Sequence, residues 1–209
     1  MQLSSPDATD HAHAWFADQL RYLSSGARVS ESEGTFTAHL NPDQRARVCL
    51  LCCWHEPWAE RVHGVHSAVS LSALYVMEVL KAAARHHSPE VSALFVAQDT
   101  LSSRAEAFSA GRCMLDSGRA TRLVVVAAGC APAGGLATAG GTSVHGLLDA
   151  AQLPPLSRSG LDDDVVDELS ECHAQGIAAC VLDPVLAPGR LLEPQDLWSA
   201  LENSLLSSE

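Results

Sequence analysis

The sequence has little positive charge and no long apolar run. It contains a single lysine, Lys81, and its formal net charge is −12 over 209 residues. Proteins that bind nucleic acids neutralise phosphates with Lys and Arg, so this charge balance argues against such a surface. The longest uncharged segment, 123–148, contains six glycines and a proline, which makes a poor membrane-spanning helix. We therefore expect no nucleic-acid partner and no membrane partner.

The N-terminus and the cysteines show no sign of secretion. The first fifteen residues contain no basic stretch followed by an apolar one, as a signal peptide would. The seven cysteines are odd in number and have no framework spacing, which is typical of reduced thiols inside the cell. These features predict a cytoplasmic protein with free cysteines.

Motifs that identify several enzyme classes are also missing. The glycine-rich segment 129–146 fits neither the phosphate-loop motif G-x-x-x-x-G-K-[ST] nor the dinucleotide motif G-x-G-x-x-G. No G-x-S-x-G or H-E-x-x-H occurs either. We therefore expect no bound cofactor.

Possible metal ligands are dense in one segment only, and they are Cys49, Cys52, Cys53, His55, Glu56, His63 and His66. A zinc site needs four ligands that converge tetrahedrally. Because consecutive strand residues point to opposite faces, Cys52 and Cys53 cannot easily share an ion while the strand stays straight. We predict no metal site here, and metal binding by this cluster is the open alternative.

Apolar patterning predicts an α/β fold organised around 91–129. Continuous apolar runs at 92–97 and 123–128 are typical of strands that helices cover on both faces. Between them a helix is predicted at 104–117, with Ser103 and Glu106 in capping-box spacing. Further strands are predicted at 35–40, 48–54 and 176–182, further helices at 67–87 and 195–206, and a loop at 28–34. We expect a single domain, 1–209, with an N-terminal helix within 1–30 and a C-terminal helix within 190–209.

The block 98–129, QDTLSSRAEAFSAGRCMLDSGRATRLVVVAAG, resembles the nucleophile segment of β-ketoacyl synthases, condensing enzymes of the thiolase superfamily. That family has an Asp-Thr-Ala-Cys-Ser-Ser type turn, a helix, a Ser-Gly pair and an apolar strand that ends in glycines. The matching residues are Asp99, Thr100, Ser102, Ser103, Ser117, Gly118 and the strand 123–129. With similar flanking segments, the resemblance covers a ketosynthase-like core at 45–185. It implies a layered α-β-α, thiolase-like half-fold with a mostly parallel mixed sheet.

The chain departs from this family at the nucleophile, where Leu101 or Ser102 replaces the cysteine, depending on the alignment. The family's chains are also about twice as long and take their activating histidines from the second half. The resemblance therefore implies an accessory or pairing subunit of polyketide or fatty-acid assembly. It would form a homodimer, or a heterodimer with a full-length condensing enzyme, through the strand at 91–97. Acyl carrier protein and acyl-CoA are further expected partners.

Two other functions stay open from the sequence. In one, the chain is an acyltransferase or thioester hydrolase with Ser102 or Cys130 as nucleophile and His145 as general base, and Ser103 lies in the same turn. In the other, it is an unrelated α/β domain with a structural or ligand-binding role, because short α/β units share these patterns whatever they do.

Overall fold

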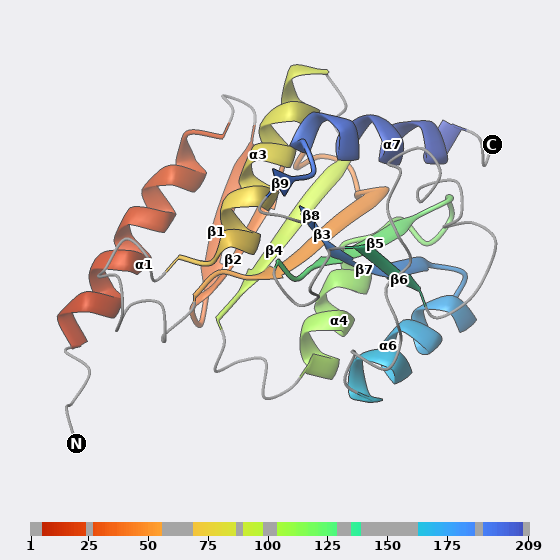
Figure 1. Cartoon of the computed structure of the whole chain (residues 1–209), viewed down its shortest axis with the longest axis horizontal. Helices are drawn as coiled ribbons and strands as arrows, with labels where there is room; N and C mark the ends of the chain where they lie inside the picture. Colours follow the sequence, from red (N-terminus) through yellow and green to blue (C-terminus); the bar gives the residue numbers. More distant parts are fainter. Residues whose placement is uncertain are drawn as a thin grey trace.

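The computed structural model describes residues 6–23, 27–55, 69–86, 90–97, 104–128, 135–138, 163–186 and 190–206. In these ranges the helices are α1 (Pro6–Arg21), α3 (Leu71–Arg85), α4 (Arg104–Cys113), α6 (Asp163–Ala174) and α7 (Pro194–Leu206). The strands are β1 (Arg28–Ser32), β2 (Thr35–His39), β3 (Val48–Cys53), β4 (Val91–Val96), β5 (Arg122–Val126), β6 (Gly135–Thr138), β7 (Ala178–Asp183), β8 (Val185–Leu186) and β9 (Arg190–Leu191). Figure 1 shows their arrangement.

Seven strands form one mixed sheet, in the order β1-β2-β4-β3-β5-β7-β6. The four central strands β4, β3, β5 and β7 are parallel, while β1, β2 and β6 join antiparallel at the two sides. Strands β8 and β9 form a separate short hairpin. The predicted α/β class and mixed sheet are therefore confirmed.

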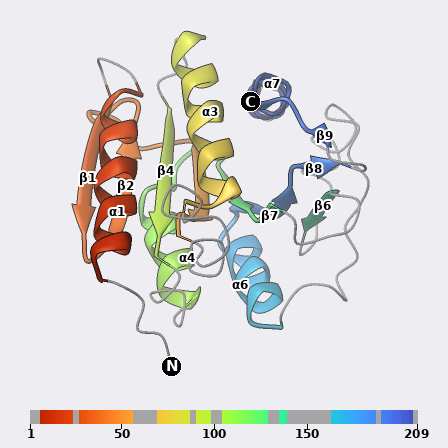
Figure 2. The same cartoon turned by 60° about the vertical axis from the view of Figure 1, so that its left-hand side comes forward.

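Helices cover both faces of this sheet, which gives three layers (Figure 2). On one face, residues such as Leu50 and Cys52 of β3 pack with α1, α3 and α7. On the opposite face, Cys49 and Leu51 of the same strand pack with α4 and α6. Because alternate residues of the central strands enter two separate cores, both faces need apolar side chains, and this explains their continuous apolar runs.

The central strands lie within two residues of their predicted positions, but 28–34 is wrong as a loop. Residues 28–32 form β1, which pairs along its length with β2. The turn between these strands places Glu33 at φ 51° and Gly34 at φ 74°. Two successive positive φ values are the geometry of a tight hairpin whose twist matches the flanking strands. The sequence predicts a loop here because most residues of this strand are exposed and show no apolar pattern.

The helix after β4 is shorter than predicted and ends at Cys113 instead of Ser117. Its last turn tightens, because Met114 N–H donates to the carbonyl of Gly111. The chain then pairs with the segment before β3: Ala46 N–H donates to Met114 O at 3.1 Å, and Asp116 N–H donates to Ala46 O at 2.9 Å. These bonds replace the helical ones, so Gly118 does not end the helix.

Strand β4 lies inside the sheet, hydrogen-bonded to β2 on one side and to β3 on the other. All six of its residues are buried. The strand at 91–97 therefore has no free edge with which to pair across a dimer. Dimer formation by another surface stays a prediction. Among the described helices, none has the length and apolar character to cross a membrane.

Candidate functional site

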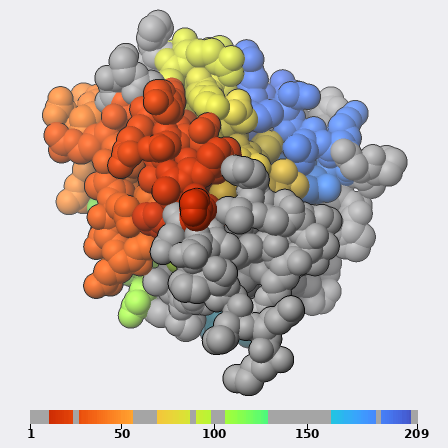
Figure 3. All heavy atoms as spheres, turned by 90° about the vertical axis from the view of Figure 1, so that its left-hand side faces the viewer, coloured from red at the N-terminus to blue at the C-terminus, as the bar shows by residue number. Residues whose placement is uncertain are grey.

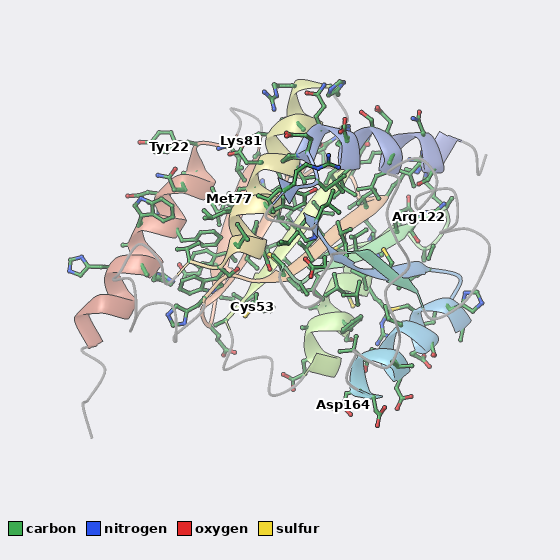
Figure 4. The ribbon with its side chains drawn as sticks, in the orientation of Figure 1. Tyr22, Cys53, Met77, Lys81, Arg122 and Asp164 are labelled. Carbon is green, nitrogen blue, oxygen red and sulfur yellow. The ribbon has the colours of Figure 1, made fainter. Side chains whose placement is uncertain are left out.

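The carboxyl ends of the four parallel strands meet at one edge of the sheet, which we call the carboxyl edge. In α/β proteins, ligands bind most often at this edge. Its described part consists of residues at or just after the end of each strand and around the start of α3: Trp54, His55, Val69, Ser70, Ser72, Ala97, Ala127, Ala128 and Asp183. Cys53 and Arg122, labelled in Figure 4, lie toward opposite ends of the sheet.

The first turn of α3 is fixed against the end of β3 by Ser70. This residue is the helix N-cap, and its hydroxyl accepts from Ala73 N–H at 3.0 Å. The same hydroxyl donates to the carbonyl of Cys53, and Ser70 N–H donates to Trp54 O at 2.8 Å. A serine immediately before an apolar helix is a cap signal in the sequence, and it marks this position.

His55 is the histidine that the described structure places at the carboxyl edge. It follows β3, forms an isolated antiparallel bridge with Val69, and is half-buried. Its ring lies 5.2 Å from the ring of Trp54, measured between centroids. Histidine exchanges protons near neutral pH, so an imidazole here is able to act as a base or to bind a polar ligand group.

Polar side chains fix the backbone near the ends of β5 and β7. Ala128 N–H donates to the hydroxyl of Ser72 at 2.9 Å, which ties the end of β5 to α3. Asp183 is fully buried, and its Oδ1 accepts from Val185 N–H at 3.0 Å. Ser72 and Asp183 therefore shape this edge through the backbone.

Cys49 and Cys52 of β3 do not meet at one metal site. Cys49 belongs to the core under α4 and α6 and Cys52 to the core under α3, so these two thiols lie on opposite faces of the sheet. Burial raises the pKa of Cys49 to about 12 and that of Cys52 well above its usual range, which opposes the thiolate form that binds metals. Across the described residues, no three His, Cys, Asp or Glu side chains gather closely enough to hold an ion. The described donor set therefore does not fit a metal ion.

The remaining candidate residues fall outside the part of the chain that the structure describes. This applies to the proposed nucleophiles Ser102, Ser103 and Cys130, to the proposed base His145, and to Glu56, His63 and His66. Of the candidate ligands in 49–66, Cys53 and His55 lie at the carboxyl edge: Cys53 ends β3, and its Sγ donates to His55 O at 3.7 Å. The sequence did not indicate Trp54 or Ser72, whose roles depend on contacts between distant segments.

Nearly all of the chain is similar in fold to solved structures, one of which is an aminopeptidase. The Legionella pneumophila LapA aminopeptidase aligns over 97% of this chain with a TM-score of 0.50 and 11% identity. LapB from the same organism aligns over 98% with a TM-score of 0.51 and 9% identity. The chain spans 64% of the LapA chain and 66% of the LapB chain, which is less than two thirds of each. No family model and no curated protein matches the sequence.

These comparisons overturn the resemblance to β-ketoacyl synthases and the thiolase-like fold that it implied. The accessory role in polyketide or fatty-acid assembly is wrong, and the acyltransferase or thioester hydrolase alternative has no support. The described part of 98–129 consists of a helix and the strand that follows it, α4 and β5, a pairing that many α/β folds share. The partners inferred from the resemblance lose that basis and stay untested. What this chain shares with LapA and LapB is the fold.

Proposed function

We propose that this chain binds the amino end of short peptides at the carboxyl edge of its sheet, with His55 in contact with the ligand. The observation that carries the proposal is the half-buried imidazole at the end of β3, beside the first turn of α3, in a fold that it shares with an aminopeptidase. A histidine in this place offers a hydrogen-bonding group at the edge where α/β folds bind their ligands.

The charge of the chain favours a cationic ligand group. The formal net charge is −12, and a negative potential attracts groups of the opposite sign. The free α-ammonium of a peptide carries such a charge, and an N-acetylated peptide does not. The proposal therefore predicts a preference for free amino ends.

Hydrolysis needs more than this histidine, because a nucleophile or a metal-bound water must attack the peptide carbonyl. Since the described residues do not fit a metal ion, we derive no hydrolytic step. Binding is the function proposed, and hydrolysis is measured beside it.

The test follows the ring resonances of the histidines by NMR while peptides are added. The resonance of His55 is assigned with His55→Gln, and His173→Gln, an exposed histidine in the last turn of α6, is the matched control. We expect peptides with free amino ends to shift the His55 resonance and to bind weakly to His55→Gln but normally to His173→Gln. Amino acid release is measured in parallel with zinc, manganese, cobalt or a chelator.

Three results would contradict the proposal. If no peptide shifts the His55 resonance at millimolar concentration and none is hydrolysed, the chain does not act on peptides. If acetylated peptides bind as well as free ones, the amino end is not recognised. If His55→Gln binds like the wild type, the site lies elsewhere.

A further inference from the structure

Trp54 joins the carboxyl edge to three other parts of the fold. Its side chain is 3% exposed, and its indole N–H donates to the carbonyl of Gly34 at 2.8 Å. Its backbone N–H donates to Val96 O at 3.0 Å, and its carbonyl accepts from Ser70 N–H at 2.8 Å. The residue is therefore bonded to the turn between β1 and β2, to the end of β4 and to the cap of α3.

The indole of Trp54 contacts two rings of α1 and the ring of His55. The ring of Phe16 in α1 stacks on the indole, with centroids 5.5 Å apart and planes inclined by 7°. His13, one turn earlier in α1, contacts it edge-on at 5.7 Å. His55 lies against the indole at 5.2 Å with an inclination of 45°. Trp54 thus lies in direct contact with both α1 and the candidate ligand-binding residue.

Aromatic rings contribute to the packing of α1 against the sheet. Phe16 also contacts Phe36 of β2 at 5.3 Å and Phe95 of β4 at 5.2 Å, both in T-shaped geometry. His13 Nε2 of α1 also lies 2.9 Å from Glu31 Oε1 of β1. In Figure 3, α1 lies at the surface beside the β1–β2 hairpin. A shift in the position of α1 against the sheet therefore acts first on these rings. Trp54 is one of them.

We propose that Trp54 is a positioning residue for His55, and that α1 acts on the carboxyl edge through it. The stacked ring of Phe16 fixes one side of the indole, and the indole in turn limits the orientations of the His55 ring. This proposal rests on the proposed function in one respect, that His55 contacts the ligand. Side chains held by packing keep a binding site in its productive geometry, so loosening the indole weakens binding without removing a ligand contact.

The experiment compares two identical substitutions in the two cores. Phe16→Leu removes the ring that stacks on Trp54 and keeps an apolar side chain. Phe108→Leu makes the same change at a buried phenylalanine in the core under α4, on the opposite face of the sheet. We expect Phe16→Leu to shift the ring resonances of His55 and to weaken peptide binding about twofold to tenfold, the range of a lost aromatic pair. Phe108→Leu should lose similar stability and leave both properties unchanged.

A second variant keeps the test decisive if Phe16→Leu does not fold. His13 is partly exposed, so His13→Ala removes a ring contact of Trp54 at little risk to the core. It should move the His55 resonances in the same direction by a smaller amount. The proposal is overturned if the His55 resonances of folded Phe16→Leu or His13→Ala coincide with those of the wild type. Because these resonances are measured without ligand, this failure is distinct from a wild type that binds no peptide.

Discussion

Two buried arginines at the amino end of the sheet should hold the C-terminal end of α7, and removing either should loosen that helix. Arg122 Nη2 donates to Ser204 O at 3.2 Å, and Arg47 Nη2 donates to Leu205 O at 3.2 Å. Both acceptors lie in the last turn of α7, where helix carbonyls have no intrahelical partner. Cations in this position also interact favourably with the helix dipole.

The magnitude follows from these contacts. A hydrogen bond from a charged donor contributes about 1.5–3 kcal/mol, and a cation at a helix C-terminus about 0.3–1 kcal/mol. Burial and the neighbouring Arg47 lower the pKa of Arg122, so part of its gain offsets the desolvation of its charge. We therefore expect Arg122→Met to reduce the free energy of unfolding by about 2 kcal/mol. Arg47→Met should reduce it by about 3 kcal/mol, because Arg47 also pairs with Glu90 at 3.6 Å.

The assay is urea unfolding followed by far-UV circular dichroism, with hydrogen exchange of the α7 amides beside it. Arg85→Met, at an exposed position in the last turn of α3, is the matched control and should change stability by less than about 0.5 kcal/mol. Exchange should accelerate in α7 and stay unchanged in β3. A stability of Arg122→Met within about 0.5 kcal/mol of the wild type would refute the reasoning, because it would mean that the guanidinium bonds only balance their own desolvation.

Three further predictions concern single residues. Burial and, to a smaller extent, Arg28 lower the pKa of His39, so the neutral ring is favoured in the folded state. The free energy of unfolding should therefore fall as the pH drops below about 6.5. In urea unfolding from pH 7.5 to 5, His39→Asn should lose that pH dependence. Gly34 has a φ of 74°, so Gly34→Ala should reduce the free energy of unfolding by about 1 kcal/mol in thermal unfolding. Gly118→Ala is the control and should change it little. Equal stabilities of the two variants would contradict a requirement for glycine in the hairpin turn. Cys113 is exposed, so Cys113→Ser should remove one thiol from the fast phase of labelling by a disulfide reagent, and an unchanged fast phase would place that thiol in the interior.

The central strands could be predicted from the sequence because their burial leaves a local signal. β3, β4, β5 and β7 are covered on both faces, so nearly every residue is apolar and the run stands out from its neighbours. β1 gives no such signal. Its residues RVSES are mostly exposed, and it is a strand because β2 pairs with it and Val29 packs against the core. The two-residue strands β8 and β9 are too short for any periodicity.

The candidate site was only partly accessible to sequence reasoning. His55 belonged to the cluster of possible ligands because histidine and cysteine types are visible in the sequence. Trp54 gave no signal, since its importance comes from Phe16, thirty-eight positions earlier, and from Gly34, which contact it only in the folded chain. Ser70 was detectable as a helix cap, but its bonds to β3 depend on the tertiary fold. Side-chain type is a local property, and the arrangement that gives a site its chemistry is not.

The error over the family has the same physical origin. A buried strand, a polar turn and a helix that returns to a second buried strand satisfy the same requirements of backbone bonding and burial in any layered α/β protein. The sequence of 91–129 meets those requirements. It contains no pattern, however, that indicates that β3 lies between β4 and β5, or that the antiparallel β2 borders β4. Those neighbours are supplied by residues 35–53, which lie outside the block 98–129 whose motifs suggested the family. Strand order, which separates one α/β fold from another, therefore had to come from the whole chain. The same holds for the carboxyl edge, where β3, β4 and α3 are joined through Trp54 and Ser70.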